Sequence, residues 1–487
     1  MGNVALKPTG EPSAAGFGAS AFDEGFGPDG RPRGSYAALF SRLDAPALDD
    51  AAGWIERELA RRGVVFGGAD PHPFAVDPIP RLLEPGEWGP VEAGLIQRVR
   101  ALNEFLADVY GEGRILAAGE VPGRVVEEAD WFEPAMAAGA APAVRAHVAG
   151  PDLVRCPDGE FRVLEDNLRA PSGLTYLLAA REAIGPLMLA SGLRPRGLDP
   201  ALEALRASLR EAAPAGRDDP TVVLLSDGVG VSSAFYEHRE LARLLDLRVA
   251  TIADLRREGD LLLVREEGEP GPGTRVDVIY RRIDDERLTA PDGSPTELGD
   301  LLVEPLLAGE LGCVNSPGSG VADDKAVHTY VERMIAFYLG EEPLLRSVRG
   351  FDLGDPAQRA EALPRLGELV VKPRSEFGGS GVLVGPLATE EERASVRTLV
   401  EAAPERFVAQ EPVALSTHPT IVDGELRSRH VDLRPFVITG ESGITVVPGG
   451  LTRFARGEGE MVVNSGRGGG AKDTWVLKPQ GTQGTSS

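Results

Sequence analysis

The chain has 487 residues, a length that allows two to four domains with a sizeable core. Its formal net charge of −24 argues against sequence-independent nucleic-acid binding, which needs a basic surface to displace counterions. We expect no membrane partner and a cytoplasmic location, because no apolar run approaches the roughly 20 residues of a membrane span and no signal-like start is present. Cys156 and Cys313 are too few for a disulfide scaffold, and the six scattered histidines form no metal-ligand pair.

The first part of the chain predicts an irregular segment followed by helices. Residues 1–35 are rich in glycine and proline, whereas residues 36–140 are mostly helical in pattern, with apolar residues at 3–4 spacing in Leu48–Arg62 and Pro90–Val109. Residues 141–215 then combine short β-type runs with two helices. The runs are Val144–Val148, Asp152–Arg155 and Phe161–Glu165, with a turn at Pro157-Asp158-Gly159, and the helices are Leu174–Ala190 and Pro200–Ala212.

Residues 216–320 predict a βαβ-type domain with a nearly parallel sheet. Its parts are a continuous apolar strand, a Gly/Ser loop, an amphipathic helix and three further strands: Thr221–Leu225, 226–233, Ala234–Leu245, and strands near Arg248–Ala250, Leu261–Val264 and Val276–Tyr280.

Residues 321–477 predict another mixed unit, and residues 478–487 a disordered tail. The expected elements are a helix over Lys325–Leu339, strands Leu369–Lys372 and Val382–Val384, helix Glu390–Ala402, strand Arg406–Ala409, and a strand pair around Asp432–Ile438 and Gly443–Pro448.

Lysine is rare in this chain, with five lysines among 51 basic residues. Three of the five lie in dense small-and-polar motifs, at Lys325, Lys372 and Lys472. A lysine ammonium is a compact, strongly hydrated charge that grips a phosphate where arginine would not substitute. The pattern therefore favours a locally positive phosphate pocket, with chance survival of each lysine as the alternative.

The last third of the chain orders further polar parts around these lysines. Lys372 ends a strand and precedes a Gly-rich loop that could close over phosphates, Gln410-Glu411-Pro412-Val413 stands at a strand end, and Arg434 and Arg453 follow. Neither a P-loop nor a helix-opening G-x-G-x-x-G is present. Far upstream, Glu165 and Asn167 are two residues apart, so on a strand they face one side and could share a hard cation with Asp152; Asp158 could take the place of Asp152.

These motifs in this order resemble the circularly permuted type 2 ATP-grasp family, relatives of the synthetase domain of glutathionylspermidine synthase. The resemblance runs from about Ala21 to Leu477 and includes LEDNLRAPSG at Leu164–Gly173, VADDK at Val321–Lys325 and GGGAKDTWV at Gly468–Val476. It implies an α+β (mixed α/β) fold: a circularly permuted ATP-grasp with a βαβ pre-ATP-grasp-like domain and a helical N-terminal region. Residues 141–215 would supply the metal-binding part and residues 321–477 the nucleotide-binding part.

The resemblance also implies roles for individual residues, with ATP and Mg²⁺ as cofactors. The catalytic set would be Arg453, Lys372 and Asn464, and the magnesium ligands Asp152, Glu165 and Asn167. The nucleotide would contact Lys325, Lys372, Gly378, Gly379, Gly381, Gln410, Glu411, Val413, Arg434 and Lys472. Asn464 and Lys472 could instead only tie down a glycine loop.

Substrate residues are less sharply indicated. The candidates for the acceptor and carboxylate pockets are Arg169, Ser172, Arg281, Arg282, Asp284 and Asp285, and the last four could equally form a structural ion-pair network. His238 could be a packed core residue or a proton-transfer group.

The expected function is that of a Mg·ATP-dependent carboxylate–amine ligase that forms a peptide or amide bond through an acyl phosphate. The substrates would be small-molecule or peptide acids and amines. One alternative is a nucleotide-binding scaffold that acts in a complex, since family members often appear beside a helical alpha-E protein and a transglutaminase-like protein. The other is a kinase or ATPase that uses the same grip.

Overall fold

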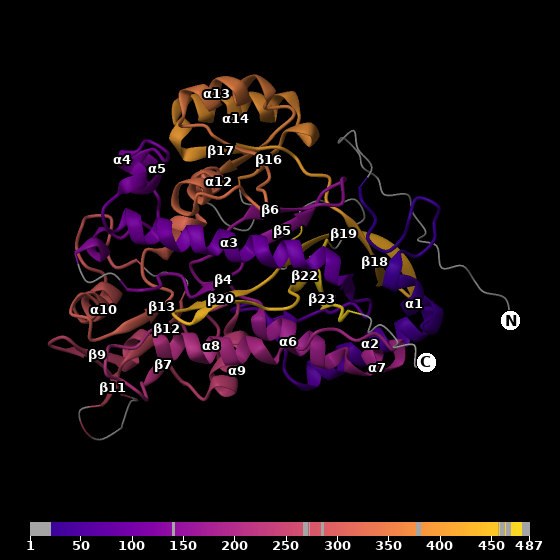
Figure 1. Cartoon of the computed structure of the whole chain (residues 1–487), viewed down its shortest axis with the longest axis horizontal. Coiled ribbons are helices and arrows are strands. Elements are labelled where there is room, and N and C mark those ends of the chain that lie inside the picture. The colour runs from indigo at the N-terminus through magenta and orange to yellow at the C-terminus, as the bar shows by residue number, and fades with distance from the viewer. Residues whose placement is uncertain are drawn as a thin grey trace, which may run out of the picture.

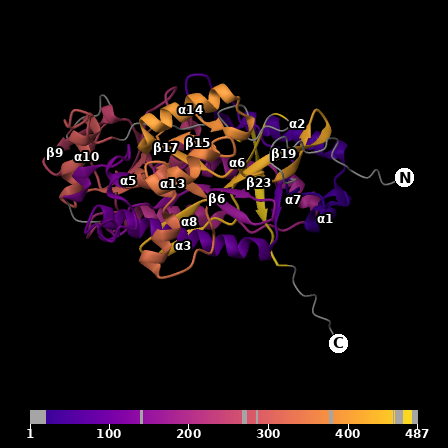
Figure 2. The same ribbon diagram turned by 90° about the horizontal axis from the view of Figure 1, so that it is seen from above.

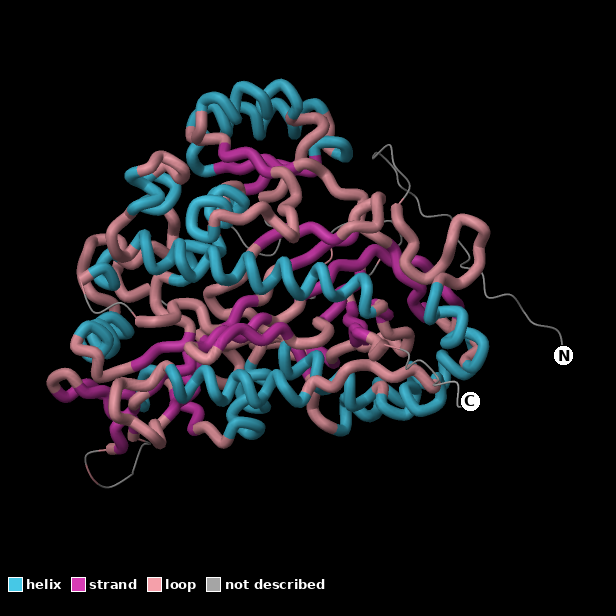
Figure 3. The backbone as a smooth tube through the Cα atoms, in the orientation of Figure 1, coloured by secondary structure: helices cyan, strands magenta, loops and turns pink. Residues whose placement is uncertain are grey.

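The computed structural model describes residues 21–138, 142–265, 271, 273–283, 287–375, 381–455, 457, 463 and 469–479. Helices and strands are mixed throughout, with helices along the upper and lower surfaces, which confirms the α+β class expected from the sequence (Figure 1 and Figure 3). Helices and sheets pack against each other because a strand or helix must bury its apolar face against another element.

A sheet at the centre of the molecule contains strands from distant parts of the chain. They follow the order β3 (Arg81–Leu83), β23 (Gly470–Val476), β22 (Leu451–Phe454), β19 (Glu425–Arg434), β5 (Asp152–Arg155) and β6 (Phe161–Glu165). β5 pairs antiparallel with β19, where Leu153 lies opposite Leu433, and both leucines are fully buried. β5 also pairs with β6, and both strands have the predicted bounds. A hairpin from the first third of the chain therefore completes a sheet built largely from its last quarter.

One more strand belongs to the central sheet, and three others form a sheet of their own. β18 (Thr417–Val422) pairs with β19, while β4 (Val148–Ala149), β20 (Val437–Gly440) and β21 (Gly443–Val446) form a separate small sheet. The predicted run Val144–Val148 is a strand only at its end. The predicted strand Asp432–Ile438 is two strands in different sheets, because Pro435 interrupts it and has no N–H to donate to a ladder.

The N-terminal helices are α1 (Gly34–Arg42), α2 (Ala45–Arg61), α3 (Pro85–Val109), α4 (Arg114–Ala117) and α5 (Gly123–Glu127). The longest of them, α3, crosses the middle of the molecule (Figure 1). It begins five residues before the predicted start at Pro90, because Glu84 and Glu87 form a capping box with each other's backbone. Its buried face includes Trp88, Leu95 and Phe105, so it packs as a core helix.

Three helices follow the hairpin β5–β6: α6 (Leu174–Ala183), α7 (Gly185–Ser191) and α8 (Asp199–Glu211). The predicted single helix Leu174–Ala190 is thus two helices, and the second begins at Gly185 with Pro186 in its first turn, a position where proline is favoured.

The predicted βαβ arrangement is present as a parallel sheet. Its order is β13 (Gly312–Val314), β12 (Val278–Arg282), β7 (Val222–Ser226) and β8 (Arg248–Ala250), with α9 (Phe235–Leu245) between β7 and β8 and α10 (Glu297–Leu307) before β13. The predicted strand Leu261–Val264 does not join this sheet. As β10 it pairs antiparallel with β9 (Leu255–Glu258) and β11 (Thr274–Val276), because the two-residue connection from β9 permits only a hairpin.

An upper lobe has its own small core. Its antiparallel sheet runs β14 (Gly350–Asp352), β17 (Phe407–Gln410), β15 (Val370–Pro373) and β16 (Leu383–Val384), with α13 (Pro356–Ala362) and α14 (Glu390–Ala402) above it (Figure 1). Leu369, Val371 and Val400 belong to an apolar cluster confined to this lobe. Helix α14 has the predicted bounds and begins at a capping box of Thr389 and Glu392.

The predicted helix Lys325–Leu339 is broken into α11 (Lys325–His328), α12 (Val331–Met334) and a π-helical turn at Ile335–Leu339. Two side-chain hydrogen bonds hold the break. Thr329 Oγ1 donates to the Ala326 carbonyl at 2.7 Å, and Tyr330 donates to Asp352 Oδ2 in the lobe at 2.8 Å.

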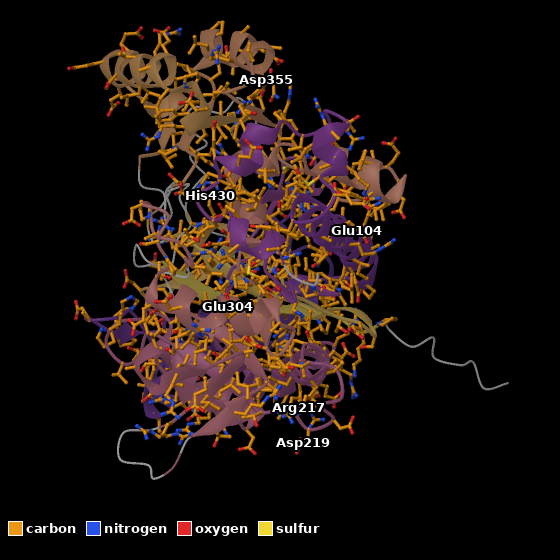
Figure 4. The ribbon with its side chains drawn as sticks, turned by 90° about the vertical axis from the view of Figure 1, so that its left-hand side faces the viewer. Glu104, Arg217, Asp219, Glu304, Asp355 and His430 are labelled. Atoms are coloured by element: carbon orange, nitrogen blue, oxygen red, sulfur yellow. The ribbon has the colours of Figure 1, made fainter. Side chains whose placement is uncertain are left out.

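The lobe, the central sheet and the parallel sheet follow one another from top to bottom in Figure 1. Seen from above, α13 and α14 lie over its centre, with α10 towards one end and α1 and α7 towards the other (Figure 2). From the side, Asp355 at the start of α13, His430 in β19 and Arg217 before β7 mark the three levels (Figure 4). The edge of the central sheet that carries β5 and β6 therefore faces the lobe.

Candidate active site

Asp152 at the start of β5 is the centre of a buried acid–arginine cluster. Arg434 donates Nε to Asp152 Oδ1 and Nη2 to Oδ2, both at 2.7 Å, and Arg453 Nη2 donates to Oδ2 at 2.8 Å. Arg453 also binds Asp432 at 2.5 Å. The two guanidiniums hold the pKa of Asp152 well below its usual range against the opposing effect of burial. Asp152 is therefore an ionised carboxylate that joins β5 to β19 and β22.

Glu165 at the end of β6 lies beside Asp152, and the two carboxyl groups share a hydrogen bond. Burial, and then the negative charge of Asp152, raise the pKa of Glu165, while Lys372 and Arg434 oppose this rise. The pair thus behaves as a coupled site in which Asp152 stays ionised and Glu165 retains a proton more readily.

Lys372 of β15 and Lys325 of α11 meet across a narrow cavity of about 20 Å³, which Glu165, His328 and Gln410 also line. Lys372 Nζ donates to Gln410 Oε1 at 2.6 Å. Burial lowers the pKa of Lys372, the Glu165 carboxylate raises it, and the nearby Lys325 ammonium lowers it. Lys325 donates to the Arg374 carbonyl at 3.4 Å. The two rare lysines thus lie in one pocket, with a carboxylate from the first third of the chain.

A larger groove of about 1050 Å³ adjoins this cavity and shares Thr329 and Gly350 with it. The strand end predicted to meet the nucleotide, Glu411–Val413, lines the groove. The carboxylate of Glu411 pairs with Arg365 at 2.9 Å. The backbone N–H of Glu411 donates to the Arg349 carbonyl. The volume of the groove suits a drug-sized or nucleoside-sized group, whereas the volume of the narrow cavity does not.

His328 is a cavity residue that the motif analysis missed. Asp166 lies between Glu165 and Asn167 in sequence, and its Oδ2 is 2.7 Å from His328 Nδ1. Arg98 of α3 binds both oxygens of Asp166, at 2.6 and 2.7 Å. Burial lowers the pKa of His328 although Asp166 raises it, and His328 Nε2 is a buried atom with no hydrogen-bond partner among the described residues. A neutral imidazole with Nδ1–H on Asp166 would present Nε2 as an acceptor in the cavity.

Asp323 is the second cavity residue that was missed, although it lies within the VADDK motif. One of its carboxylate oxygens accepts from the N–H groups of Leu168 and Arg169. It therefore fixes the segment that follows Asn167 against the lysine cavity. Asn167 itself donates Nδ2 to the Gly150 carbonyl at 3.1 Å, which leaves its amide oxygen out of that bond.

The predicted substrate residues divide into two groups. Arg282 binds Ser172 Oγ at 2.6 Å and Glu237 Oε1 at 2.7 Å, and Glu237 also accepts from the backbone N–H groups of Gly173 and Thr175. This arrangement favours the structural ion-pair interpretation for Arg282, with Glu237 as its partner, and Ser172 is bound to the same guanidinium. Arg169 instead stacks over the Trp131 ring at 4.2 Å, and buried Arg281 donates to the Ser316 carbonyl at 3.3 Å.

Two other predicted residues have structural surroundings. Lys472 is fully buried in β23, where it pairs with Asp77 and donates to the Pro419 carbonyl at 3.1 Å. This placement favours the structural alternative for Lys472 over nucleotide contact, although it holds the C-terminal strand rather than the glycine loop expected from the sequence. His238 is 2.9 Å from Ser226 Oγ, and burial lowers its pKa to about 3, as expected for a packed neutral histidine.

The remaining predicted residues lie in loops. Gly381 is described and has a φ of +65°, and a Cβ there would lie 2.9 Å from the Pro373 ring. Gly378, Gly379, Asn464, Asp284 and Asp285 lie outside the described residues.

The predicted magnesium set fits a divalent cation in part. Glu165 and Asn167 can offer oxygen ligands, the kind that Mg²⁺ prefers, and a cation would relieve the repulsion between Glu165 and Asp152. However, both oxygens of Asp152 already accept from arginines, and the described residues contain no group of three or more His, Cys, Asp or Glu side chains that could hold a metal. Glu165 is therefore the principal candidate ligand.

Bacterial proteins resemble this chain over most of its length. A protein of Mycobacterium tuberculosis (strain ATCC 25618 / H37Rv), named as uncharacterised, is 41% identical over 473 residues, which are 95% of this chain and 85% of that protein. A Frankia alni protein (strain DSM 45986 / CECT 9034 / ACN14a), provisionally named glutamate–cysteine ligase 2-3, is 41% identical over 468 residues. These residues are 93% of this chain but only 54% of the Frankia protein.

The fold also has a solved counterpart. An apo glutathione synthetase-like effector from Globodera pallida superposes with a TM-score of 0.56 at 11% identity, over 89% of this chain and 98% of that one. No helix among the described residues is long and apolar enough to cross a membrane. The family model for circularly permuted ATP-grasp type 2 matches residues 80–455. This range includes the hairpin β5–β6 that carries Asp152 and Glu165 (the carboxylate hairpin) and the upper lobe that carries Lys372 (the lysine lobe). The chain belongs to the circularly permuted ATP-grasp type 2 family.

Proposed function

We propose that this protein is a Mg·ATP-dependent carboxylate–amine ligase. One observation carries the proposal: Lys325, Lys372 and Glu165 line a single cavity, and Glu165 in turn contacts the cluster of Asp152 and Arg453. These residues come from distant parts of the sequence and combine phosphate-binding cations with a magnesium-type carboxylate. The name of the Frankia relative, a glutamate–cysteine ligase, is in line with amide-bond formation, although much of that protein lies outside the match.

The nucleotide would span the groove and the cavity. The base and ribose would lie in the groove along Glu411–Val413, and the phosphates would extend to Lys325 and Lys372. Lys372 would exchange its hydrogen bond with Gln410 for one with a phosphate oxygen. Since the cavity holds only about 20 Å³, the lobe that carries Lys372 must move away from Glu165 to admit the phosphates. The separate apolar core of the lobe suits such a motion.

Glu165, with the amide oxygen of Asn167, would hold Mg²⁺. When bound, the cation would supply positive charge that neutralises the phosphates. Arg434 and Arg453 keep Asp152 ionised beside this position. Among the described residues, no hydrogen bond uses Arg453 Nη1. We propose that Nη1 donates to the phosphoryl group during its transfer.

The reaction needs no protein nucleophile. A carboxylate oxygen of the acid attacks the γ-phosphorus, the bond from that phosphorus to the β,γ-bridging oxygen breaks, and ADP leaves. The amine nitrogen then attacks the acyl carbon, inorganic phosphate leaves, and the amine loses a proton to solvent. The protein contributes positioning, charge neutralisation and exclusion of water, which would otherwise hydrolyse the acyl phosphate.

The test is a hydroxylamine trap. Purified protein with Mg·ATP and a panel of acids should release ADP only with the right acid, and hydroxylamine should convert the acyl phosphate to a hydroxamate. Glu165→Gln should abolish both signals. ADP release without any acid, or phosphorylation of a hydroxyl with no hydroxamate, would replace the ligase with an ATPase or a kinase. Nucleotide binding with no turnover in any combination would favour the scaffold.

A further inference from the structure

Three buried hydrogen-bond donors lie around the loop that follows β13, and none of them has an acceptor among the described residues. They are Arg145 (through Nε and Nη1), the Ser319 hydroxyl and Trp131 Nε1. Arg145 is 3% exposed and Ser319 is 1% exposed. Buried polar groups are normally paired, so a cluster of donors with no acceptor indicates a missing anionic or strongly accepting group.

Arg145 is the most informative member of the cluster. Its guanidinium lies 4.8 Å from the centre of the Tyr110 ring, and burial lowers its pKa with only Tyr110 opposing this effect. No described carboxylate pairs with it, whereas Arg98, Arg181 and Arg282 each have one. Burying an unpaired cation is costly, and the aromatic ring offsets the cost only partly. An anion beside Arg145 would offset the rest.

The loop is packed so that these donors are held in place. Tyr110 donates its hydroxyl to the Gly318 carbonyl at 3.1 Å, and a Cβ at Gly318 would lie 2.2 Å from that hydroxyl. A Cβ at Gly320 would lie 2.7 Å from Trp131 Cβ. Ser316 N–H donates to the Arg145 carbonyl at 2.8 Å, which ties Arg145 to the same loop. Glycines at 318 and 320 therefore permit Tyr110 and Trp131 to approach the loop closely.

The loop leads directly to the candidate active site. Asn315 donates to the Leu168 carbonyl at 2.6 Å, one residue after the candidate magnesium ligand Asn167. Ser319 begins the turn Ser319–Asp323, and Asp323 lines the lysine cavity while it holds the N–H groups of Leu168 and Arg169. The turn Ser319–Asp323 thus connects the donor cluster to the lysine cavity, and Asn315 connects the same loop to the segment that follows Asn167.

We propose that Arg145, Ser319 and Trp131 form a carboxylate-binding subsite that holds a second, non-reacting carboxylate of the acid substrate. The inference rests on the proposed ligase function. It narrows the substrate class to dicarboxylic acids or acidic peptides. The reacting carboxylate must approach the phosphate near Glu165, so a carboxylate at Arg145 would be a different one, and it would anchor the acid from its other end. None of these three residues is among the substrate positions predicted from the sequence.

The probes are succinate, glutarate and adipate, with butyrate and glycine as comparison ligands. Each is titrated calorimetrically into the full chain without nucleotide, and the unfolding temperature is recorded with and without ligand. We expect at least one dicarboxylate to bind more tightly than butyrate, and Arg145→Met to weaken that dicarboxylate by about 10- to 150-fold, the effect of losing a charge-assisted hydrogen bond.

The unfolding temperature of the unliganded variants separates a binding role from a structural one. Arg145→Met should leave it unchanged or raise it, because an unpaired buried charge is removed. The matched control is Arg181→Met, which breaks the buried pair with Asp473 and should lower it. A fall with Arg145→Met as large as the control's would make Arg145 a structural cation and overturn the proposal.

Further binding results would also overturn the proposed subsite or its assignment to the acid. Equal binding of the dicarboxylate to wild type and Arg145→Met, or no preference over butyrate, would overturn the subsite. Glycine binding that depends on Arg145, without dicarboxylate binding, would assign the carboxylate to the amine and overturn its assignment to the acid. Since these titrations contain no ATP, they do not depend on the ligase activity. A separate titration with an ATP analogue would show whether the proposed function fails instead.

Discussion

Asp152→Asn should destabilise the central sheet by about 3–5 kcal/mol, the range for breaking a buried ion pair. Asp152 is fully buried and accepts three charge-assisted hydrogen bonds, of 2.7, 2.7 and 2.8 Å. An asparagine keeps one acceptor oxygen but turns its amide N–H groups towards the arginines. Arg453 would retain Asp432, so most of the loss falls on Arg434. Each such bond contributes roughly 1.5–3 kcal/mol, and the loss of about two of them agrees with this range.

The assay is urea denaturation at pH 7, followed by tryptophan fluorescence, since Trp475 is buried in β23 of the same sheet. The pKa of Asp152 is lowered by folding, so its contribution is complete above the unfolded pKa of about 4 and is lost as the pH falls through the folded value. The control is Asp158→Asn, which removes an exposed pair with Arg162 on the same hairpin and should cost less than about 1 kcal/mol. Equal costs for the two variants would refute the claim that the cluster joins β5 to the C-terminal strands.

Three further predictions concern single residues of the candidate site and of the C-terminal strand. The raised pKa of Glu165 means that protons compete with Mg²⁺, so calorimetry should show the Mg²⁺ dependence of ATP-analogue binding weakening as the pH falls from 8 to 5. Glu165→Gln should remove that pH dependence, and a dependence that persists would place the metal elsewhere. Lys472→Met should lower the unfolding temperature because it strands buried Asp77, yet change the ATP-analogue Kd less than about twofold; a Kd raised more than about tenfold would return Lys472 to the nucleotide site. His328→Phe should weaken the analogue by about 5- to 10-fold by removing the Nε2 acceptor, and an unchanged Kd would contradict a contact with the nucleotide.

Much of the fold could be predicted from the sequence because strong local signals agreed with it. Strands β5 and β6 and helix α14 have the predicted bounds, each set by a turn or a capping box. Errors arose where long-range contacts decide the structure. Lys325–Leu339 reads as one helix by periodicity, but the hydrogen bond from Tyr330 to Asp352 in the lobe holds its break. Leu261–Val264 reads as a strand, and only its partners show which sheet it joins.

The candidate site could likewise be predicted only in part. Lys325, Lys372 and Glu165 could be found because their residue types and order resemble a known family, and the structure brings them into one cavity. His328 and Arg145 could not be found, since a single histidine or arginine in the sequence gives no signal until its burial and surroundings are known. The pairing of Lys472 with Asp77 also joins residues 395 positions apart, which no local pattern predicts. The division of the chain into six segments stays a prediction.

The central claim is that the carboxylate hairpin and the lysine lobe form one nucleotide site. The most direct measurement is calorimetric titration of a non-hydrolysable ATP analogue, with and without Mg²⁺, into wild type, Lys372→Ala and Glu165→Gln. The account predicts Mg²⁺-dependent binding to wild type, a loss of at least about tenfold with Lys372→Ala, and binding to Glu165→Gln that no longer responds to Mg²⁺. Unchanged binding by Lys372→Ala, or full Mg²⁺ dependence in Glu165→Gln, would contradict it.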